Sequence, residues 1–100
     1  MTQKVNIRDM LRSRREEILH IAEKHGAGNV RIFGSVVRGE ATDESDIDFL
    51  IDIVGPTPPW FPGGLVADLE DLLGHRIDVV TEDSIYCLLR PRILKEAEPL

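Results

Sequence analysis

Apolar and polar residues alternate most clearly between positions 46 and 54 of this chain. Ile47, Phe49, Ile51 and Ile53 share one parity, and Asp46, Asp48, Leu50 and Asp52 share the other. A period of two is typical of a β-strand with one face against a core. The pattern therefore predicts a central strand over 46–54, with its aspartates on the face opposite the core.

Hydrophobic spacing and chain-breaking residues predict the other elements. In chain order we expect a helix over Ile7–His25, a strand over Asn29–Phe33, one helical turn over Val36–Gly39, a helix over Leu65–Leu73, a strand over Arg76–Thr81, a turn of helix over Glu82–Tyr86 and a last helix over Pro91–Ala97. This order predicts an α/β (α+β) fold, a small mixed sheet of at least three strands flanked by helices. Whether the strands pair parallel or antiparallel stays open.

One long connection interrupts this series. Gly55–Gly64 holds four prolines and three glycines in ten residues, which predicts a loop within the domain. Its Trp60 and Phe61 either pack against the domain, which we favour, or contact a nucleobase or a partner. The function of this loop is not assigned.

Composition narrows the class of protein. One hundred residues with 42% hydrophobic content predict a single domain over 1–100. The lone Cys87 excludes an internal disulfide and is expected in the core, with Tyr86 half-buried. We find no signal sequence and no apolar run near the roughly 18 residues of a membrane span, so we expect a cytoplasmic protein.

Charge is distributed unevenly along the chain. The net charge of −6 argues against a general nucleic-acid binder. Residues 1–38 carry eight Lys or Arg and four acids, whereas residues 39–100 carry four and fourteen. The basic part is either a solvated helix surface, which we favour, or an edge that meets phosphate or an acidic partner.

The aspartates of the central strand are candidates for metal binding. Asp46 and Asp48 lie roughly 6–7 Å apart on one face. Two charges at that distance repel by about 2.5 kcal/mol at an effective dielectric near 20. The pair is either a solvated face or the site of a hard cation such as Mg²⁺. Asp78 has the matching parity on the later strand and joins them if the two strands are neighbours.

A glycine-serine turn follows the first strand. Gly34 lets the backbone approach a phosphate, and amides where a helix begins favour an anion. The hydroxyl of Ser35 adds a donor, and Arg38, one turn later, can clamp a phosphate. A Gly-Ser turn alone is commonplace. Combined with the three aspartates, it favours phosphoryl or nucleotidyl transfer from a nucleoside triphosphate.

The string Gly34-Ser35-x₁₀-Asp46-x-Asp48 resembles the signature of the polymerase-β-like nucleotidyltransferase superfamily. The fuller stretch GSVVRGEATDESDID, together with the strand RIDVV, is similar to the minimal nucleotidyltransferase (MNT) branch. This resemblance implies the palm-like fold of that superfamily. It also implies an antitoxin that transfers AMP from ATP to a tyrosine of a HEPN-domain RNase toxin and so blocks the toxin.

Carried over to this chain, the resemblance assigns roles to six residues. Asp46, Asp48 and Asp78 would bind Mg²⁺, as two ions in the family's pattern, and form the catalytic group. Gly34 and Ser35 would hold the triphosphate of ATP, with Arg38 nearby. Two alternatives stay open: an MNT-fold antitoxin that inhibits the toxin by contact alone, and a transferase acting on a small molecule such as an aminoglycoside.

Overall fold

The computed structural model describes residues 6–42 and 44–100. Its elements are, in chain order, α1 (Ile7–Ser13), α2 (Arg15–Lys24), β1 (Ala27–Phe33), α3 (Ser35–Arg38), β2 (Ile47–Ile53), α4 (Gly63–Leu73), β3 (Ile77–Thr81), a 3₁₀ turn (Glu82–Ser84), α5 (Arg90–Glu96) and β4 (Glu98–Pro99). The strands form one sheet in the order β3-β2-β1-β4. β2 and β3 run parallel, whereas β1 runs antiparallel to both β2 and β4. The fold class is therefore mixed α and β with a mixed sheet, as the sequence predicts.

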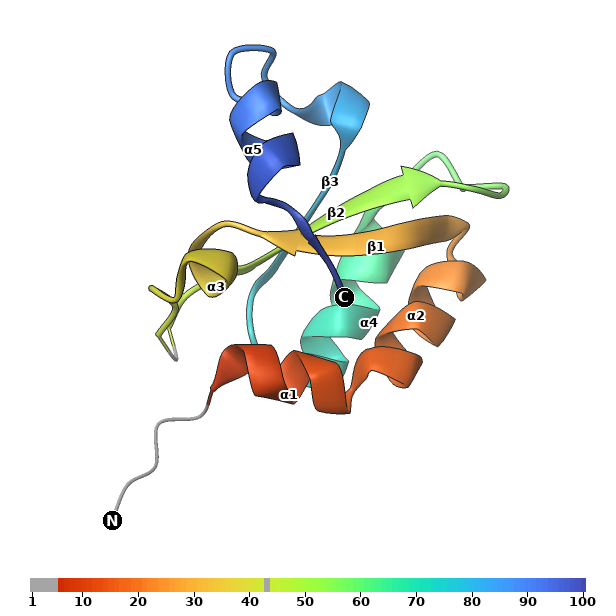
Figure 1. Ribbon diagram of the computed structural model, residues 1–100. Coiled ribbons are helices and arrows are strands. Elements are labelled where there is room, and N and C mark those ends of the chain that lie inside the picture. The colour runs from red at the N-terminus through yellow and green to blue at the C-terminus, as the bar shows by residue number, and fades with distance from the viewer. Residues whose placement is uncertain (1–5, 43) are drawn as a thin grey trace.

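The helices cover the two faces of the sheet unequally. Figure 1 shows α1, α2 and α4 gathered on one side of the sheet and α5 on the other. The main core lies on the three-helix side, where Ile47, Phe49 and Ile51 of β2 pack among apolar residues of these helices. On the other side a smaller cluster of Phe33, Leu50 and Ile85 is buried. The sheet face toward α5 thus has room for polar groups.

The alternation along β2 is confirmed at most positions. Ile47, Phe49 and Ile51 are almost completely buried. Leu50 shares the parity of the aspartates and is buried too, because the segment around α5 covers that part of the sheet. Ile53 differs from the prediction, since it is 55% exposed at the end of β2 where no helix covers it.

The predicted helix over Ile7–His25 is wrong in one respect, because the chain forms two helices. They meet at Arg14, whose backbone is no longer helical, and Figure 1 shows them running in different directions. Asn6 caps α1 through its side chain, which accepts from the amides of Arg8 and Asp9. The bend lets both pieces bury their apolar sides against the sheet, through Leu11 in α1 and Ile18 in α2.

Several predictions about single residues need correction. Cys87 is exposed, and Tyr86 is 64% exposed, because the chain around them stands away from the main core. In the proline-rich loop Phe61 packs against the core as expected, but Trp60 is 72% exposed. The short strand β4 was not predicted, since two residues carry no periodic signal.

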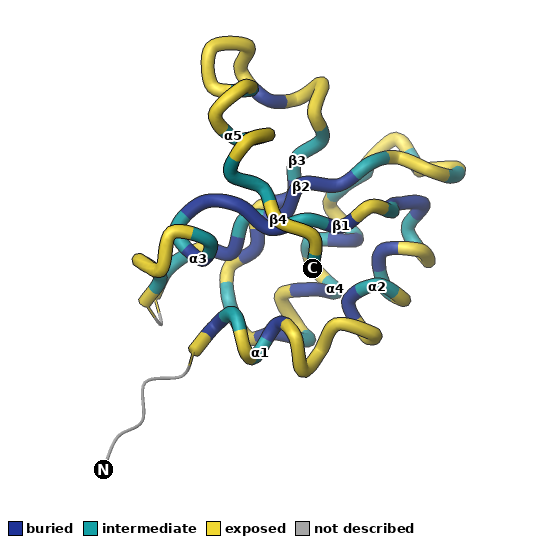
Figure 2. Tube along the Cα trace, in the orientation of Figure 1, coloured by how far each residue is buried: buried dark blue, intermediate teal, exposed yellow. Residues whose placement is uncertain are grey.

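Within residues 6–42 and 44–100, no helix is both long enough and apolar enough to cross a membrane. Figure 2 shows where exposure concentrates: α5 and the chain leading into it are largely exposed, whereas β1 and β2 are mostly buried through the middle of the molecule.

Candidate active site

Two of the predicted acidic residues lie opposite each other where β2 and β3 begin, and the third immediately precedes β2. β2 and β3 are neighbours, as the metal-site prediction requires, and their register places Asp48 directly opposite Asp78. Asp46 precedes β2 by one residue and is exposed. Because side chains alternate along a strand and Ile47 is buried in the main core, Asp48 lies on the sheet face away from that core. The strand register thus brings Asp48 beside Asp78, whereas a common site that also includes Asp46 stays a prediction.

The electrostatics of Asp48 reflect this crowding. Burial, together with the negative charges of Asp78 and Asp46, raises the pKa of the Asp48 carboxyl from 3.8 to about 6, while Arg38 acts in the opposite direction. Ionisation of the Asp48 carboxylate therefore lowers the free energy of unfolding of the protein. A raised pKa caused by burial and nearby like charges is common at functional sites.

This donor set fits a hard divalent cation. Its side-chain donors are carboxylate oxygens, the ligands that Mg²⁺ prefers, and a bound cation would relieve the repulsion at Asp48. In the part of the chain that the structure describes, however, no three acidic, histidine or cysteine side chains already meet closely enough to hold an ion. The assignment of Asp46, Asp48 and Asp78 as metal ligands therefore stays a prediction.

Gly34 fills a position that no other residue type fits. Its φ of 77° lies in the left-handed region, between the end of β1 and the start of α3. A Cβ added at Gly34 would overlap the carboxylate of Asp48. The glycine thus brings the backbone of the turn directly against the acidic group. Ser35 is the first residue of α3, which has only four residues, so any phosphate would depend on individual amide and hydroxyl donors.

Arg38 and Gly34 share a partner that sequence reasoning missed. The Glu96 carboxylate accepts from the Arg38 Nη1 at 2.8 Å and from the Gly34 amide at 2.9 Å. Burial raises the pKa of Glu96, but the hydrogen bonds from Gly34 and Arg38 outweigh burial and lower it. Glu96 thereby ties α5 to the glycine-serine turn. No sequence signal indicates this contact, because 58 residues separate Glu96 from Arg38.

A hollow of about 280 Å³ opens between these residues and α5. It is lined by Phe33, Gly34, Arg38, Asp48, Leu89, Arg92, Ile93 and Glu96. Three of the six predicted site residues, Gly34, Arg38 and Asp48, therefore border one open space. Charged and apolar side chains line this space on both sides, with Phe33 and Asp48 from the sheet and Arg92 and Ile93 from α5.

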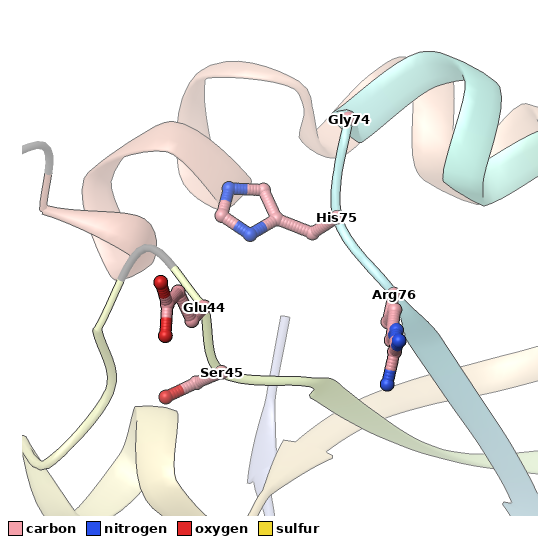
Figure 3. Close-up of a pocket in the computed structure, with 5 residues that line it drawn as sticks. All are labelled: Glu44, Ser45, Gly74, His75 and Arg76. Carbon is pink, nitrogen blue, oxygen red and sulfur yellow. The ribbon is translucent and has the colours of Figure 1, made fainter.

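A second hollow, of about 470 Å³, lies beside the starts of the same two strands. Figure 3 shows its lining residues: Glu44 and Ser45 come from the loop before β2, and Gly74, His75 and Arg76 from the connection between α4 and β3. Ser45 is adjacent in sequence to Asp46, and Arg76 lies two residues before Asp78. This hollow therefore lies next to the segments that carry Asp46 and Asp78, although neither aspartate lines it.

Comparison with known proteins identifies the family. The model of the nucleotidyltransferase domain family matches residues 15–100. The chain belongs to this family. A relative of this nucleotidyltransferase in Methanocaldococcus jannaschii is named, provisionally, a protein adenylyltransferase. The two sequences are 40% identical over 83 residues, which cover 83% of this chain and 89% of the relative. The protein adenylyltransferase MntA of Thermococcus cleftensis is 36% identical over 76 residues, 76% of this chain and 77% of that protein.

Solved structures agree with the fold of this nucleotidyltransferase. One, described provisionally as a minimal nucleotidyltransferase, is 43% identical with a TM-score of 0.80 and covers 92% of this chain and 94% of its own. A toxin–antitoxin structure with AMP-PNP has a TM-score of 0.70 at 19% identity, covering 84% of this chain and 69% of its own, which supports the fold alone. The resemblance seen in the sequence motifs is thus confirmed.

Replacing Glu96 by Ala tests the connection between α5 and the turn. We expect the free energy of unfolding at pH 7 to fall by about 2 kcal/mol, because the Gly34 amide and Arg38 lose a charged acceptor. Glu98→Ala is the control, since Glu98 forms an exposed ion pair with Arg8 at 2.9 Å and should contribute less than about 1 kcal/mol. Urea denaturation measures both values, and equal losses in the two variants would contradict the assignment.

The pH dependence of the Glu96 contribution has a defined sign. The pKa of Glu96 is lowered from 4.5 in the folded protein, so its stabilising contribution is present above that pH and is lost as the pH falls through the folded-state pKa. The difference in stability between the native protein and Glu96→Ala should therefore shrink in acid.

Proposed function

We propose that this chain, as one minimal nucleotidyltransferase domain over residues 1–100, is an antitoxin that transfers AMP from ATP to a tyrosine hydroxyl of a HEPN-domain RNase toxin. One observation carries the proposal: Asp48 faces Asp78 across β2 and β3 next to the Gly34 turn. The protein adenylyltransferase name of the T. cleftensis relative supports AMP as the group transferred. The toxin–antitoxin structure with AMP-PNP supports a toxin partner and a nucleoside triphosphate.

One group of residues binds the phosphates of ATP, and a second group would bind the metal ion. Gly34, Ser35 and Arg38 hold the triphosphate, and Asp46, Asp48 and Asp78 would hold Mg²⁺. When bound, this ion supplies charge neutralisation at the phosphates and lowers the cost of ionising the acceptor. Because phosphoryl transfer needs little covalent help from protein, positioning and electrostatics provide most of the rate enhancement.

The chemical step exchanges one phosphorus–oxygen bond for another. The tyrosine oxygen forms a bond to the α-phosphorus of ATP while the bond from that phosphorus to the bridging oxygen of the β-phosphate breaks. Pyrophosphate leaves with that electron pair, and the phenolic proton passes to the Asp78 carboxylate. The tyrosine then carries AMP as a phosphodiester, whose bulk and negative charge block the RNase site of the toxin.

One observation favours a second function, inhibition by contact alone. Glu96 already accepts from Gly34 and Arg38, two of the groups that ATP would use. If ATP does not displace this carboxylate, the chain would neutralise a toxin only by binding to it. The two functions make different predictions about the chemical state of the toxin.

Intact-protein mass spectrometry of the HEPN partner separates them. After incubation with this chain, ATP and Mg²⁺, we expect the partner to gain one or more AMP groups and to lose RNase activity. Asp46→Ala is a suitable variant, because Asp46 is exposed and its replacement leaves the core intact. It should abolish the mass gain. No mass gain with the native chain, together with inhibition retained by Asp46→Ala, would replace catalysis by contact inhibition.

A further inference from the structure

The segment from Ile85 to Ala97, named here the α5 arm, is held to the sheet by a small apolar cluster and to the glycine-serine turn by Glu96. Ile85 is buried with Phe33 and Leu50, and half-buried Ile93 extends this cluster. α5 itself contains no buried residue. Figures 1 and 2 show the arm standing on the sheet face opposite α1, α2 and α4, largely exposed along its length. Its position is fixed, but most of its surface is uncovered.

The uncovered surface of the arm is unusually apolar. Among the described residues, seven large apolar side chains are strongly exposed, and four of them lie in the arm: Tyr86 at 64%, Leu88 at 75%, Leu89 at 48% and Leu94 at 38%. The other three, Ile53, Val54 and Trp60, belong to the end of β2 and the proline-rich loop. Exposed apolar residues scattered singly need no explanation, whereas a concentration of them marks an interaction surface.

The arm also forms one wall of the candidate active site. Leu89 and Arg92 line the hollow that contains Asp48 and Gly34. An acceptor hydroxyl has to come within about 3–3.5 Å of the atom it attacks, so the molecule that carries it must lie against this wall. A small acceptor would fit within the hollow and leave Leu88 and Leu94 exposed, whereas a protein acceptor would cover them.

Charge indicates which kind of protein fits. Only four Lys or Arg residues follow position 38, and three of them, Arg90, Arg92 and Lys95, lie in the arm. The chain as a whole has a net charge of −6, so two copies repel each other at long range. A basic, apolar arm on an acidic protein is complementary to a different partner, one with carboxylates around an apolar contact.

We propose that the α5 arm is the docking surface for the protein that accepts AMP, and that this protein presents apolar side chains ringed by acidic ones. The inference rests on the proposed function, because it takes the acceptor to be a protein. It adds the surface of this chain that recognises the acceptor. Docking on the arm places the acceptor tyrosine over the hollow at Asp48, and recognition and catalysis then use adjoining parts of one face.

The test uses the double variant Leu88→Asp/Leu94→Asp. Both side chains are exposed and neither lines the hollow, so folding and ATP binding should be unchanged. Calorimetric titration in the absence of ATP should show that the affinity of this variant for the HEPN partner is reduced at least about tenfold. If Lys95 is also replaced, the remaining affinity for the partner should decrease less steeply as the salt concentration rises. Val54→Asp/Trp60→Asp is the matched control on the other exposed apolar residues, and it should retain native affinity.

Each other outcome has a defined meaning. Native affinity in Leu88→Asp/Leu94→Asp, or an equal loss in the control variant, would overturn the docking surface. Light scattering tests whether a second copy of this chain occupies the arm instead. A native dimer that becomes a monomer in Leu88→Asp/Leu94→Asp, with partner affinity unchanged, would also overturn the proposal. Binding that depends on the arm, without any AMP transfer by the native chain, would instead reject the catalytic function and leave the docking surface in place.

Discussion

Asp48→Asn is expected to reduce AMP transfer about 100-fold or more while making the metal-free protein more stable. The loss of activity follows because the ionised carboxylate that faces Asp78 would be absent, and charged groups that stabilise a transition state contribute effects of this size. The gain in stability follows because the neutral asparagine side chain has no buried charge to desolvate and does not repel Asp78 and Asp46. A catalytic residue that destabilises the fold gives opposite signs in these two measurements.

The size of the stability gain depends on pH. Because the folded-state pKa of Asp48, about 6, lies above the ordinary value of 3.8, the protonated group stabilises the fold below that ordinary value and this contribution is lost as the pH rises through about 6. A shift of this size in a fully buried group corresponds to about 3 kcal/mol, and solvent screening at this half-buried site reduces it to about 1 kcal/mol. Asp48→Asn should therefore exceed the native protein in thermal stability at pH 7.5 and equal it near pH 4.

Asp52→Asn is the matched control on the same face of β2. Asp52 accepts from Arg31 at 2.9 Å, so its replacement should lower the stability slightly and leave AMP transfer unchanged. Thermal unfolding in buffer with a chelator, with and without added Mg²⁺, gives the comparison. Added Mg²⁺ should raise the unfolding temperature of the native protein and of Asp52→Asn, but not of Asp48→Asn. A lower stability of Asp48→Asn at pH 7.5 would mean that Asp48 is a structural residue.

Gly34→Ala is expected to have the second largest effect, reducing both stability and transfer. Alanine at a φ of 77° is strained by about 1–3 kcal/mol, and its methyl group would in addition push the Asp48 carboxylate out of place. Because displacement of a reacting group by about 1 Å can cost about 100-fold in rate, we expect a loss of transfer of that order.

Gly39→Ala separates strain from displacement. Gly39 has a nearly identical φ of 75°, but a Cβ there meets no atom within 4 Å. Its ψ of 18° lies in the left-handed helical region, where alanine is less strained than at the ψ of −149° of Gly34, so this variant should lose less stability and retain most of its transfer activity. Urea denaturation and initial rates of AMP transfer are measured on both variants. If the two variants lost transfer equally, the close approach of Gly34 to Asp48 would have no catalytic meaning.

The sequence could predict the site to the extent that the site follows from strand geometry. Alternation predicted that Asp48 lies on the face away from the core, and matching parity predicted Asp78 beside it once the strands were neighbours, which the register confirms. The parallel direction of that pairing could not be predicted, since alternation is the same in either direction. The Gly34 turn was predicted from its position after a strand, but its contact with Asp48 was not.

What sequence reasoning missed is mostly tertiary in origin. The bend at Arg14 has no glycine or proline to mark it, and the apolar spacing continues through it. The exposure of Tyr86 and Cys87 depends on the absence of a second helix layer over the α5 arm, which no local pattern encodes. The Glu96 contact joins residues far apart in the chain, and a glutamate on a short helix looks like a solvated residue until the fold is known.

Crystals of this chain with Mn²⁺ and a non-hydrolysable ATP analogue would show whether Asp48 and Asp78 hold a metal ion beside the nucleotide. We expect anomalous density for Mn²⁺ between the carboxylates of Asp48 and Asp78, with the triphosphate against Gly34 and Arg38 in place of Glu96. A nucleotide bound elsewhere, with Glu96 still accepting from Gly34 and Arg38 and no density between the two aspartates, would contradict it.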